Sequence, residues 1–215
     1  MRAPLVRRAT LWATASPSPL AGEGRVAAEG AAVGLQVQEV EPGSADGLAA
    51  AMGDEGDLVE LRLERGCRCF ASLAEGEVVA YGWVSTGTEW IGELGLEIRP
   101  PADEAYVWNC VTLPAHRLRG YFAALLRHVT RTAREEGVRR LWIGSVDGGA
   151  ERALVGAGFR PVLRFGVSSL LGLRWLSVRG ADGADPRTVA EALASLGTGR
   201  GPLRPGLRRA TRRRH

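Results

Sequence analysis

The stretch from Val111 to Leu126, VTLPAHRLRGYFAALL, decides the fold. An apolar run stops at Pro114, a short basic turn follows, and an amphipathic helix begins within a residue or two of Gly120. The first four amides of a helix have no partner inside the helix, and the helix dipole places partial positive charge there. The stretch therefore predicts an anion site at the start of the helix. Arg117 and Arg119 would add charge-assisted hydrogen bonds to a phosphate.

The chain of 215 residues is long enough for one well-buried domain with two loose ends. Residues 1–33 are rich in Ala, Gly, Ser and Pro, and residues 198–215 carry seven arginines and no acidic residue. We expect both segments to be disordered, with residues 34–180 forming the folded domain. Residues 181–197 are expected to contain a helix that begins near Asp185-Pro186. Because the two ends carry all of the net positive charge and the remainder of the chain is acidic, we do not expect a nucleic-acid partner.

Sheet patterns dominate the first half of the domain. Alternation of apolar and polar residues predicts a strand over 33–40, followed by short helices near residues 48–52 and 57–65. A hairpin with a turn at residues 75–77 fits residues 67–85, and residues 90–98 are expected to continue the meander as a third strand. The strongly apolar run 105–113 predicts a central strand buried on both faces.

The second half alternates helix and strand. Apolar residues at positions 122, 125, 126, 129 and 133 predict the helix that follows the basic turn, and Gly137 ends it. The next strand, residues 141–146, is reached by this single helical crossover, so it should run parallel to the strand at 105–113. A small helix over 148–156 and two strand-like runs within 160–178 complete the pattern.

Cysteine content and hydropathy restrict the cellular context. The three cysteines, Cys67, Cys69 and Cys110, are an odd number in a chain that needs no disulfides, which favours a reducing, cytoplasmic location. They lack further ligands at zinc-binding spacing, so we expect no metal. Because no apolar run reaches the roughly 18–20 residues of a membrane span, we expect no membrane partner.

Two segments together resemble the GNAT acyltransferase superfamily, over about residues 35–170. The first is TLPAHRLRGYFAALL, and the second is VDGGAERALVGAGFRPV, which starts at Val146. The resemblance implies an α/β (α+β) fold with a mixed, mostly antiparallel sheet of six to seven strands. A parallel central pair and about four flanking helices belong to the same expectation.

The resemblance also implies how acetyl-CoA binds. The loop pattern of the family is Arg or Gln, two residues, Gly, one residue, and Gly or Ala; Arg117 and Gly120 match it, whereas Leu118 and Phe122 replace small residues. Backbone amides near residues 118–122 would bind the pyrophosphate, and the strand end would lie along the pantetheine arm. The residues implied for acetyl-CoA are Val111, Thr112, Leu113, Arg117, Leu118, Arg119, Gly120, Tyr121, Phe122, Asp147 and Ala150. Asp147 has helix capping as an equally weighted alternative.

Proton transfer is where the sequence departs most from the family. Many relatives have a tyrosine five residues before the Phe of Gly-Phe, where this chain has Leu154. The resemblance also implies that an amide near Cys110 or Val111 polarises the thioester carbonyl. The catalytic candidates are Glu93, Tyr106 and Asn109. Glu93 is the first choice for the general base, because burial in an acceptor cleft would raise the pKa of its carboxyl; a solvent-facing strand glutamate is the alternative.

The expected activity is N-acyl transfer, most simply acetyl transfer from acetyl-CoA to an amine by direct attack within a ternary complex. The acceptor is a small-molecule or peptide amine, and the sequence leaves open whether the chain forms a homodimer. A catalytically silent acyl-CoA-binding module is the alternative, motivated by Leu154, Leu118 and Phe122 together.

Overall fold

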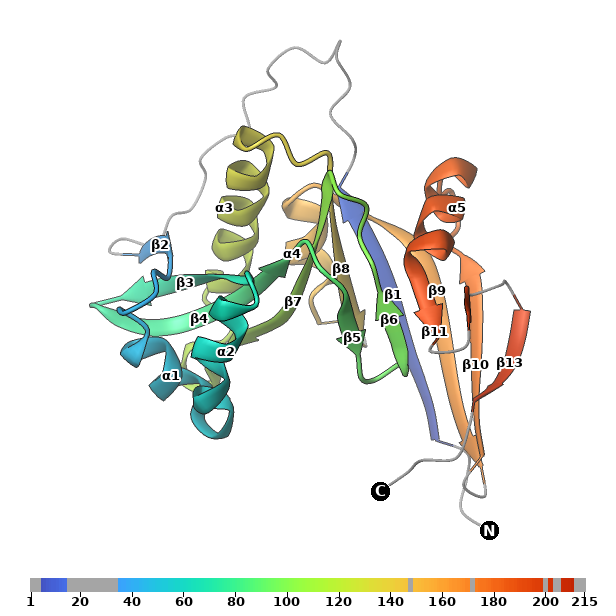
Figure 1. The fold of residues 1–215 in the computed structure, drawn as a ribbon, viewed down its shortest axis with the longest axis horizontal. Helices are drawn as coiled ribbons and strands as arrows, with labels where there is room; N and C mark the ends of the chain where they lie inside the picture. Colours follow the sequence, from blue (N-terminus) through green and yellow to red (C-terminus); the bar gives the residue numbers. More distant parts are fainter. Residues whose placement is uncertain are drawn as a thin grey trace.

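A computed structural model describes residues 5–14, 35–146, 149–170, 173–198, 201–202 and 206–210. A large twisted sheet organises these residues (Figure 1). Its strands are β1 (Leu5–Thr14), β2 (Leu35–Glu39), β3 (Arg68–Ala74), β4 (Glu77–Ser85), β7 (Glu104–Thr112), β8 (Arg140–Val146), β9 (Phe159–Leu170), β10 (Leu173–Gly180) and β13 (Gly206–Ala210). The strand order is β13-β10-β9-β1-β8-β7-β4-β3-β2.

The parallel pair expected from the sequence is present. Glu104 to Val107 of β7 pair in parallel register with Arg140 to Ile143 of β8, whereas the other pairings described in the sheet are antiparallel. Helix α3 (Tyr121–Glu135) is the crossover between these two strands. The mixed α/β fold class is thereby confirmed, but the described residues form a sheet of nine strands where six to seven were expected.

The difference comes from segments that we expected to be disordered. Leu5–Thr14 forms β1, which pairs with both β8 and β9 inside the sheet. The middle of this strand is buried, with Leu11 1% and Trp12 2% exposed. The indole Nε1 of Trp12 donates a hydrogen bond to Ser145 Oγ at 2.8 Å. Gly206–Ala210 likewise forms β13 on β10. Composition suggested disorder, yet the short run LVRRATLWAT has enough β-branched and apolar residues to fill an inner strand position.

The run 90–98 is not a further strand of the large sheet, which corrects the meander expected from the sequence. It forms the hairpin β5 (Glu89–Ile91) and β6 (Leu96–Ile98) in a second sheet of order β12-β11-β6-β5. Its other members are β11 (Leu196–Thr198) and β12 (Gly201–Pro202). The turn Gly92–Gly95 interrupts the run, and Gly95 adopts a φ of 66°, which L-residues disfavour.

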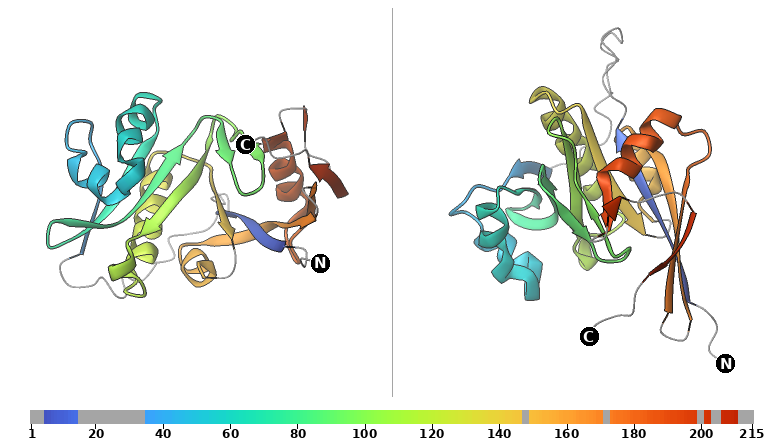
Figure 2. Two further views of the ribbon diagram at one scale, coloured as in Figure 1. Left: turned by 90° about the horizontal axis from the view of Figure 1, so that it is seen from below. Right: turned by 45° about the vertical axis from the view of Figure 1, so that its right-hand side comes forward.

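Helices cover both faces of the large sheet (Figure 2). Helix α3 and α4 (Glu151–Gly156) pack on one face through Leu125, Leu126 and Leu154. On the opposite face lie α1 (Asp46–Met52), the 3₁₀ helix η1 (Gly53–Leu58) and α2 (Val59–Glu64). Helix α5 (Pro186–Ser195) and the second sheet complete that opposite face over β1, β9 and β10.

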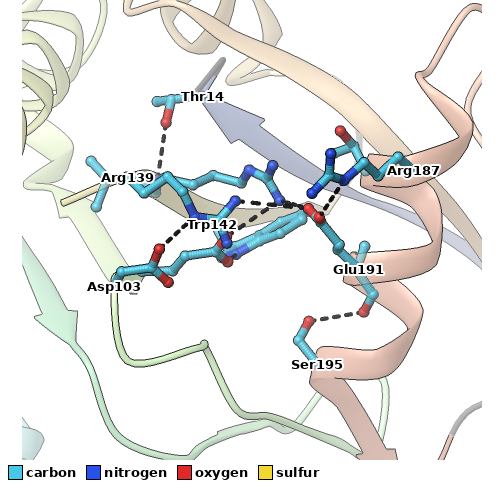
Figure 3. Close-up of polar contacts among 12 residues, drawn as sticks. Thr14, Asp103, Arg139, Trp142, Arg187, Glu191 and Ser195 are labelled. Carbon is cyan, nitrogen blue, oxygen red and sulfur yellow. Dashed lines mark hydrogen bonds and ion pairs between the residues drawn. The ribbon is translucent and has the colours of Figure 1, made fainter. Parts of the chain in front are cut away.

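A buried charge network joins α5 to the start of the parallel pair (Figure 3). Glu104, 1% exposed, accepts a hydrogen bond from Trp142 Nε1 at 2.5 Å and pairs with Arg139 and Arg140. Arg140 Nη1 also lies 2.5 Å from Glu191 Oε2 on α5. Breaking such a buried pair leaves an uncompensated charge in the interior. The network therefore fixes the position of α5 against the start of β7 and β8.

Among the described residues, no helix is both long and apolar enough to cross a bilayer.

Candidate active site

The parallel pair opens into a cleft halfway along its length. The β7–β8 ladder joins residues 104–107 to 140–143, and the two strands separate beyond that point. A cavity of about 560 Å³ lies there, lined by residues of β1, β5, β7 and β8 and by the segment around η1 and α2. Backbone groups on the inner edges of splayed strands can bond to a ligand laid between them, which a closed ladder would prevent.

A β-bulge bends β7 where it borders this cavity. Tyr81 pairs with Val111 and Trp83 with Trp108, so β7 has one residue more than β4 between these pairs. Asn109 occupies the bulge with a φ of 42°, a left-handed conformation that asparagine tolerates better than most residues. A bulge leaves the extra residue unpaired and bends its strand, so the β4–β7 ladder is interrupted where β7 borders the cavity.

The loop after β7 exposes the start of α3. Gly120, with a φ of 82°, is the N-cap and provides no side-chain hydrogen bond; Leu118 is also left-handed, with a φ of 62°. Among the described residues, none accepts a hydrogen bond from the backbone amides of residues 118–123. Leu118 and Gly120 are exposed, and Arg117 and Arg119 flank the turn as exposed cations. The arrangement has the features of an anion site: unpaired amides, a helix dipole and two guanidinium groups.

The second sequence signature forms the opposite wall. Ala150 and Leu154, from the start and middle of α4, line the cavity, and Leu154 is fully buried at 0% exposure. No phenol therefore enters the cleft from this position. Asp147 lies outside the described residues.

A polar cluster that no sequence pattern predicted borders the bulge. Glu55 Oε2, from η1, accepts hydrogen bonds from Arg62 Nη2 at 2.7 Å and from Asn109 Nδ2 at 3.0 Å. The Arg62 guanidinium is 5.3 Å from the centroid of Trp83 and 4.8 Å from that of Trp108. All of these residues except Trp83 line the cavity. Arg62 beside Glu55 lowers the pKa of that carboxyl below 4.5, so Glu55 is an anion at neutral pH.

One signal in the sequence could have revealed this cluster. Val59 and Arg62 are spaced i, i+3 on α2, and both face the interior. A charged residue on the apolar face of a short helix requires a buried partner. The partner itself, however, could not be identified from periodicity.

Two of the catalytic candidates, Glu93 and Tyr106, line the same cavity. Glu93 lies in the turn between β5 and β6, and Tyr106 lies on β7 with 5% exposure. The Tyr106 hydroxyl reaches β8, 3.2 Å from where a Cβ on Gly144 would lie. Burial, with a smaller contribution from the charge of Glu93, raises the pKa of Tyr106 well above 10, so the phenol remains a hydrogen-bond donor. Glu93 is exposed, so the burial that we expected to activate it is absent.

Cys110 also borders the cavity but is not prepared as a nucleophile. Burial raises the pKa of its thiol to about 12, and the thiol, not the thiolate, is present at neutral pH. All three cysteines are free.

The cavity thus brings together Glu93, Tyr106, Asn109, Phe122 and Ala150 from the residues selected by sequence. The strand end Val111–Leu113 and the loop at 117–120 continue outside it, along the path from the bulge to α3. Tyr121 instead packs inward against Val79 and Ala80. Among the described residues, no group of three His, Cys, Asp or Glu side chains is arranged to hold a metal.

Comparisons with known proteins identify the family of the chain. The sequence model described as the acetyltransferase (GNAT) family matches residues 43–154, about half of the chain. A search of curated protein sequences gave no match.

Solved structures share the fold at low sequence identity. A GCN5-related N-acetyltransferase from Kribbella flavida is 18% identical, with a TM-score of 0.51, over 86% of this chain and 62% of its own. An acetyltransferase of the GNAT family from Colwellia psychrerythraea is 13% identical, with a TM-score of 0.51, over 78% and 56%. A GCN5-related N-acetyltransferase from Sphaerobacter thermophilus is 18% identical, with a TM-score of 0.50, over 74% and 50%.

This chain therefore spans only about half to three fifths of the length of those structures. The family match includes the bulged strand, the loop that follows it and the start of α4. The chain belongs to the GNAT acetyltransferase family.

Proposed function

We propose that the protein is an N-acetyltransferase that transfers the acetyl group of acetyl-CoA directly to an amine bound in the same cleft. The observation that carries this proposal is the continuous path from the bulge at Asn109 to the unpaired amides at the start of α3. A diphosphate needs several converging N–H donors, and an acyl thioester needs a cleft beside the strand. The chain offers both along one short segment.

Binding of acetyl-CoA is assigned to the residues on this path. The amides of residues 118–122 would bond to the pyrophosphate, and Arg117 and Arg119 would contribute charge. Val111, Thr112 and Leu113 would lie along the pantetheine arm, opposite Ala150. Arg117 is already directed along this segment, because its Nε donates to the Thr112 carbonyl oxygen at 3.4 Å.

The bulge supplies the electrostatic part of the reaction. Asn109 in its left-handed conformation would aim the amide of Cys110 or Val111 at the thioester carbonyl oxygen. An amide fixed in this way stabilises negative charge on that oxygen as the amine attacks, without reorganising during the reaction. The protonated thiol of Cys110 favours direct transfer over an acyl-cysteine route.

Proton transfer is assigned to Glu93 and Tyr106. Glu93 would take the proton of the acceptor ammonium through water, as an exposed carboxylate at the cavity wall can. Tyr106, kept protonated by burial, would donate a hydrogen bond into the reaction site. The departing thiolate would be protonated by water, because Leu154 offers no hydroxyl.

A catalytically silent acyl-CoA-binding module is the second candidate, and the buried Leu154 favours it. Such a protein would bind acetyl-CoA but release no thiol with any amine. We further propose that the protein acts in the cytoplasm, where its free cysteines would stay reduced.

Calorimetric titration with acetyl-CoA, followed by a thiol-release assay across a panel of amines, tests these proposals. Saturable binding with thiol release is expected. Gly120→Asp should abolish binding, because it adds strain at a φ of 82° and places a carboxylate where the pyrophosphate would bind. Gly43→Asp is the matched control, since Gly43 has a φ of 87° and open space around it and does not line the cavity. Absence of acetyl-CoA binding to the wild-type protein would overturn the proposed function.

A further inference from the structure

The polar cluster beside the bulge indicates what kind of amine the cleft accepts. Glu55 and Arg62 form an ion pair whose two members differ sharply in exposure, with the Arg62 side chain 9% exposed and the Glu55 side chain 53% exposed. The positive charge is therefore buried beneath the negative one. A ligand that enters the cavity from this side encounters the carboxylate of Glu55.

The hydrogen bonds of Glu55 leave one of its oxygens available. Arg62 and Asn109 both donate to Oε2, and no donor among the described residues bonds to Oε1. Arg62 and Asn109 fix the orientation of the carboxylate, so Oε1 has a defined position at the wall of the cavity. A pre-oriented carboxylate oxygen is a strong acceptor for an ammonium group.

Arg62 cannot easily serve a ligand itself. Its guanidinium is held by Glu55 and stacks near the rings of Trp83 and Trp108. Its Nη1 atom has no hydrogen-bond partner among the described residues, but it is buried, so a ligand in the cavity does not reach it directly. A carboxylate on the ligand would therefore meet Glu55 before Arg62. The cavity lining includes a second acid, Glu93, so that its formal charges are two carboxylates against one guanidinium. The aromatic faces of Trp90, which is 60% exposed, and Trp108 add further affinity for cations.

The cation held at Glu55 differs from the nitrogen that is acetylated. The attacking nitrogen must lose a proton and become neutral, whereas an anion paired with Arg62 is a poor proton acceptor and holds a group that stays charged. Glu55 is also bonded to the side chain of Asn109, the bulge residue itself, so the held cation lies beside the reaction site.

We propose that Glu55 selects the acceptor, and that the acceptor carries a second cationic group besides the amine that is acetylated, as a diamine or polyamine does. This inference rests on the proposed function for the chemistry, but the binding site itself can be tested by binding alone. Amino acids with a terminal carboxylate in place of the second amine are excluded by the same charge.

The test is calorimetric titration with α,ω-diamines of increasing length, each compared with the monoamine and the ω-amino acid of the same chain length. Titrations are made with the full chain, both with and without coenzyme A. At the best length, the diamine should bind about tenfold or more tightly than the monoamine, the gain expected from one charge-assisted hydrogen bond. The ω-amino acid should bind more weakly than either.

Glu55→Gln keeps an acceptor for Arg62 and Asn109 but removes the charge, and it should abolish the preference for the diamine. The control is Glu60→Gln, which removes an exposed carboxylate of α2 outside the cavity. This variant should keep the preference for the diamine. Thermal melting of both variants checks that the fold is intact. Equal affinity for diamine and monoamine at every length, or a diamine preference that survives Glu55→Gln, would overturn the inference. Failure of acetyl-CoA to bind would instead contradict the proposed function. The titrations without coenzyme A would still test the binding of diamines at Glu55, so the two failures can be told apart.

Discussion

The Sγ atom of Cys110 lies only 2.8 Å from the position that a Cβ atom would occupy on Gly82. Cys110 lies in the bulged part of β7, and the missing side chain of Gly82 leaves room for its sulfur. Leu125 Cδ2 closes the same space from α3, at 3.4 Å. The bulge that borders the cleft therefore depends on a glycine of the neighbouring strand.

Replacing Gly82 with alanine should destabilise the protein and lower its turnover together. Overpacking of this kind costs about 1–3 kcal/mol of unfolding free energy. Cys110→Ala removes the clashing sulfur, so the double variant should recover part of the loss, with a coupling of about 0.5–3 kcal/mol. Urea denaturation and thiol-release rates measure the two effects. Strictly additive changes would show that the bulge does not rely on Gly82.

The inner position of β1 predicts a large effect from a residue near the start of the chain. Leu11 is 1% exposed between β8 and β9, and Leu11→Ala should cost about 2–5 kcal/mol of unfolding free energy. Arg8 of the same strand is exposed, and Arg8→Ala should stay within about 0.5 kcal/mol of wild type. Denaturant unfolding of the two variants distinguishes an inner strand from a loose end, for which both changes would be equally mild.

Tyr106→Phe tests the role proposed for the buried phenol. Loss of the hydroxyl should reduce kcat by about 10²-fold, the lower range for a group that assists proton transfer, and leave the KM for acetyl-CoA unchanged. Because the pKa of Tyr106 is raised above 10, its ionisation should cause no loss of rate at any pH below 10. Tyr81→Phe, a buried tyrosine outside the cavity, is the control for a lost hydroxyl. An unchanged kcat in Tyr106→Phe would contradict the assignment.

The network at α5 predicts an acid-dependent contribution to stability. The Arg140 guanidinium lowers the pKa of Glu191 below 4.5, so the unfolded chain binds this proton more readily than the folded one. The stabilisation is therefore fully present above about pH 4.5 and is lost as the pH falls through the folded pKa. The Tm of wild type should exceed that of Glu191→Gln by a constant amount from neutral pH to about 5.5, and the difference should shrink below about 4.5.

Thermal melts as a function of pH provide the measurement for this prediction. Glu64→Gln, which removes an exposed carboxylate with no ion pair among the described residues, serves as the control and should follow wild type throughout. A Tm difference that grows on acidification would reverse the sign derived from Arg140.

Local patterns in the sequence were sufficient for the centre of the fold. The apolar spacing of Phe122, Leu125 and Val129 predicted α3, which begins at Tyr121, and a single helical crossover predicted the parallel pair. These features depend on residues close together in the chain, and periodicity reports them directly. The same holds for the loop at Arg117–Gly120, whose anion-binding character follows from chain order alone.

Only the tertiary structure decided which distant residues meet. Glu55 reaches Asn109 across 54 positions of sequence, and β1 inserts between β8 and β9 at separations that no window of sequence covers. The composition of residues 1–33 even argued against β1. The strand forms because the free energy of burying its apolar area in the sheet outweighs the weak conformational preference of a short segment. The sequence alone thus determined the strand, loop and helix of a phosphate-binding path. The polar cluster of Glu55, Arg62 and Asn109 depends on strand register and on packing between elements, and these are properties of the whole fold.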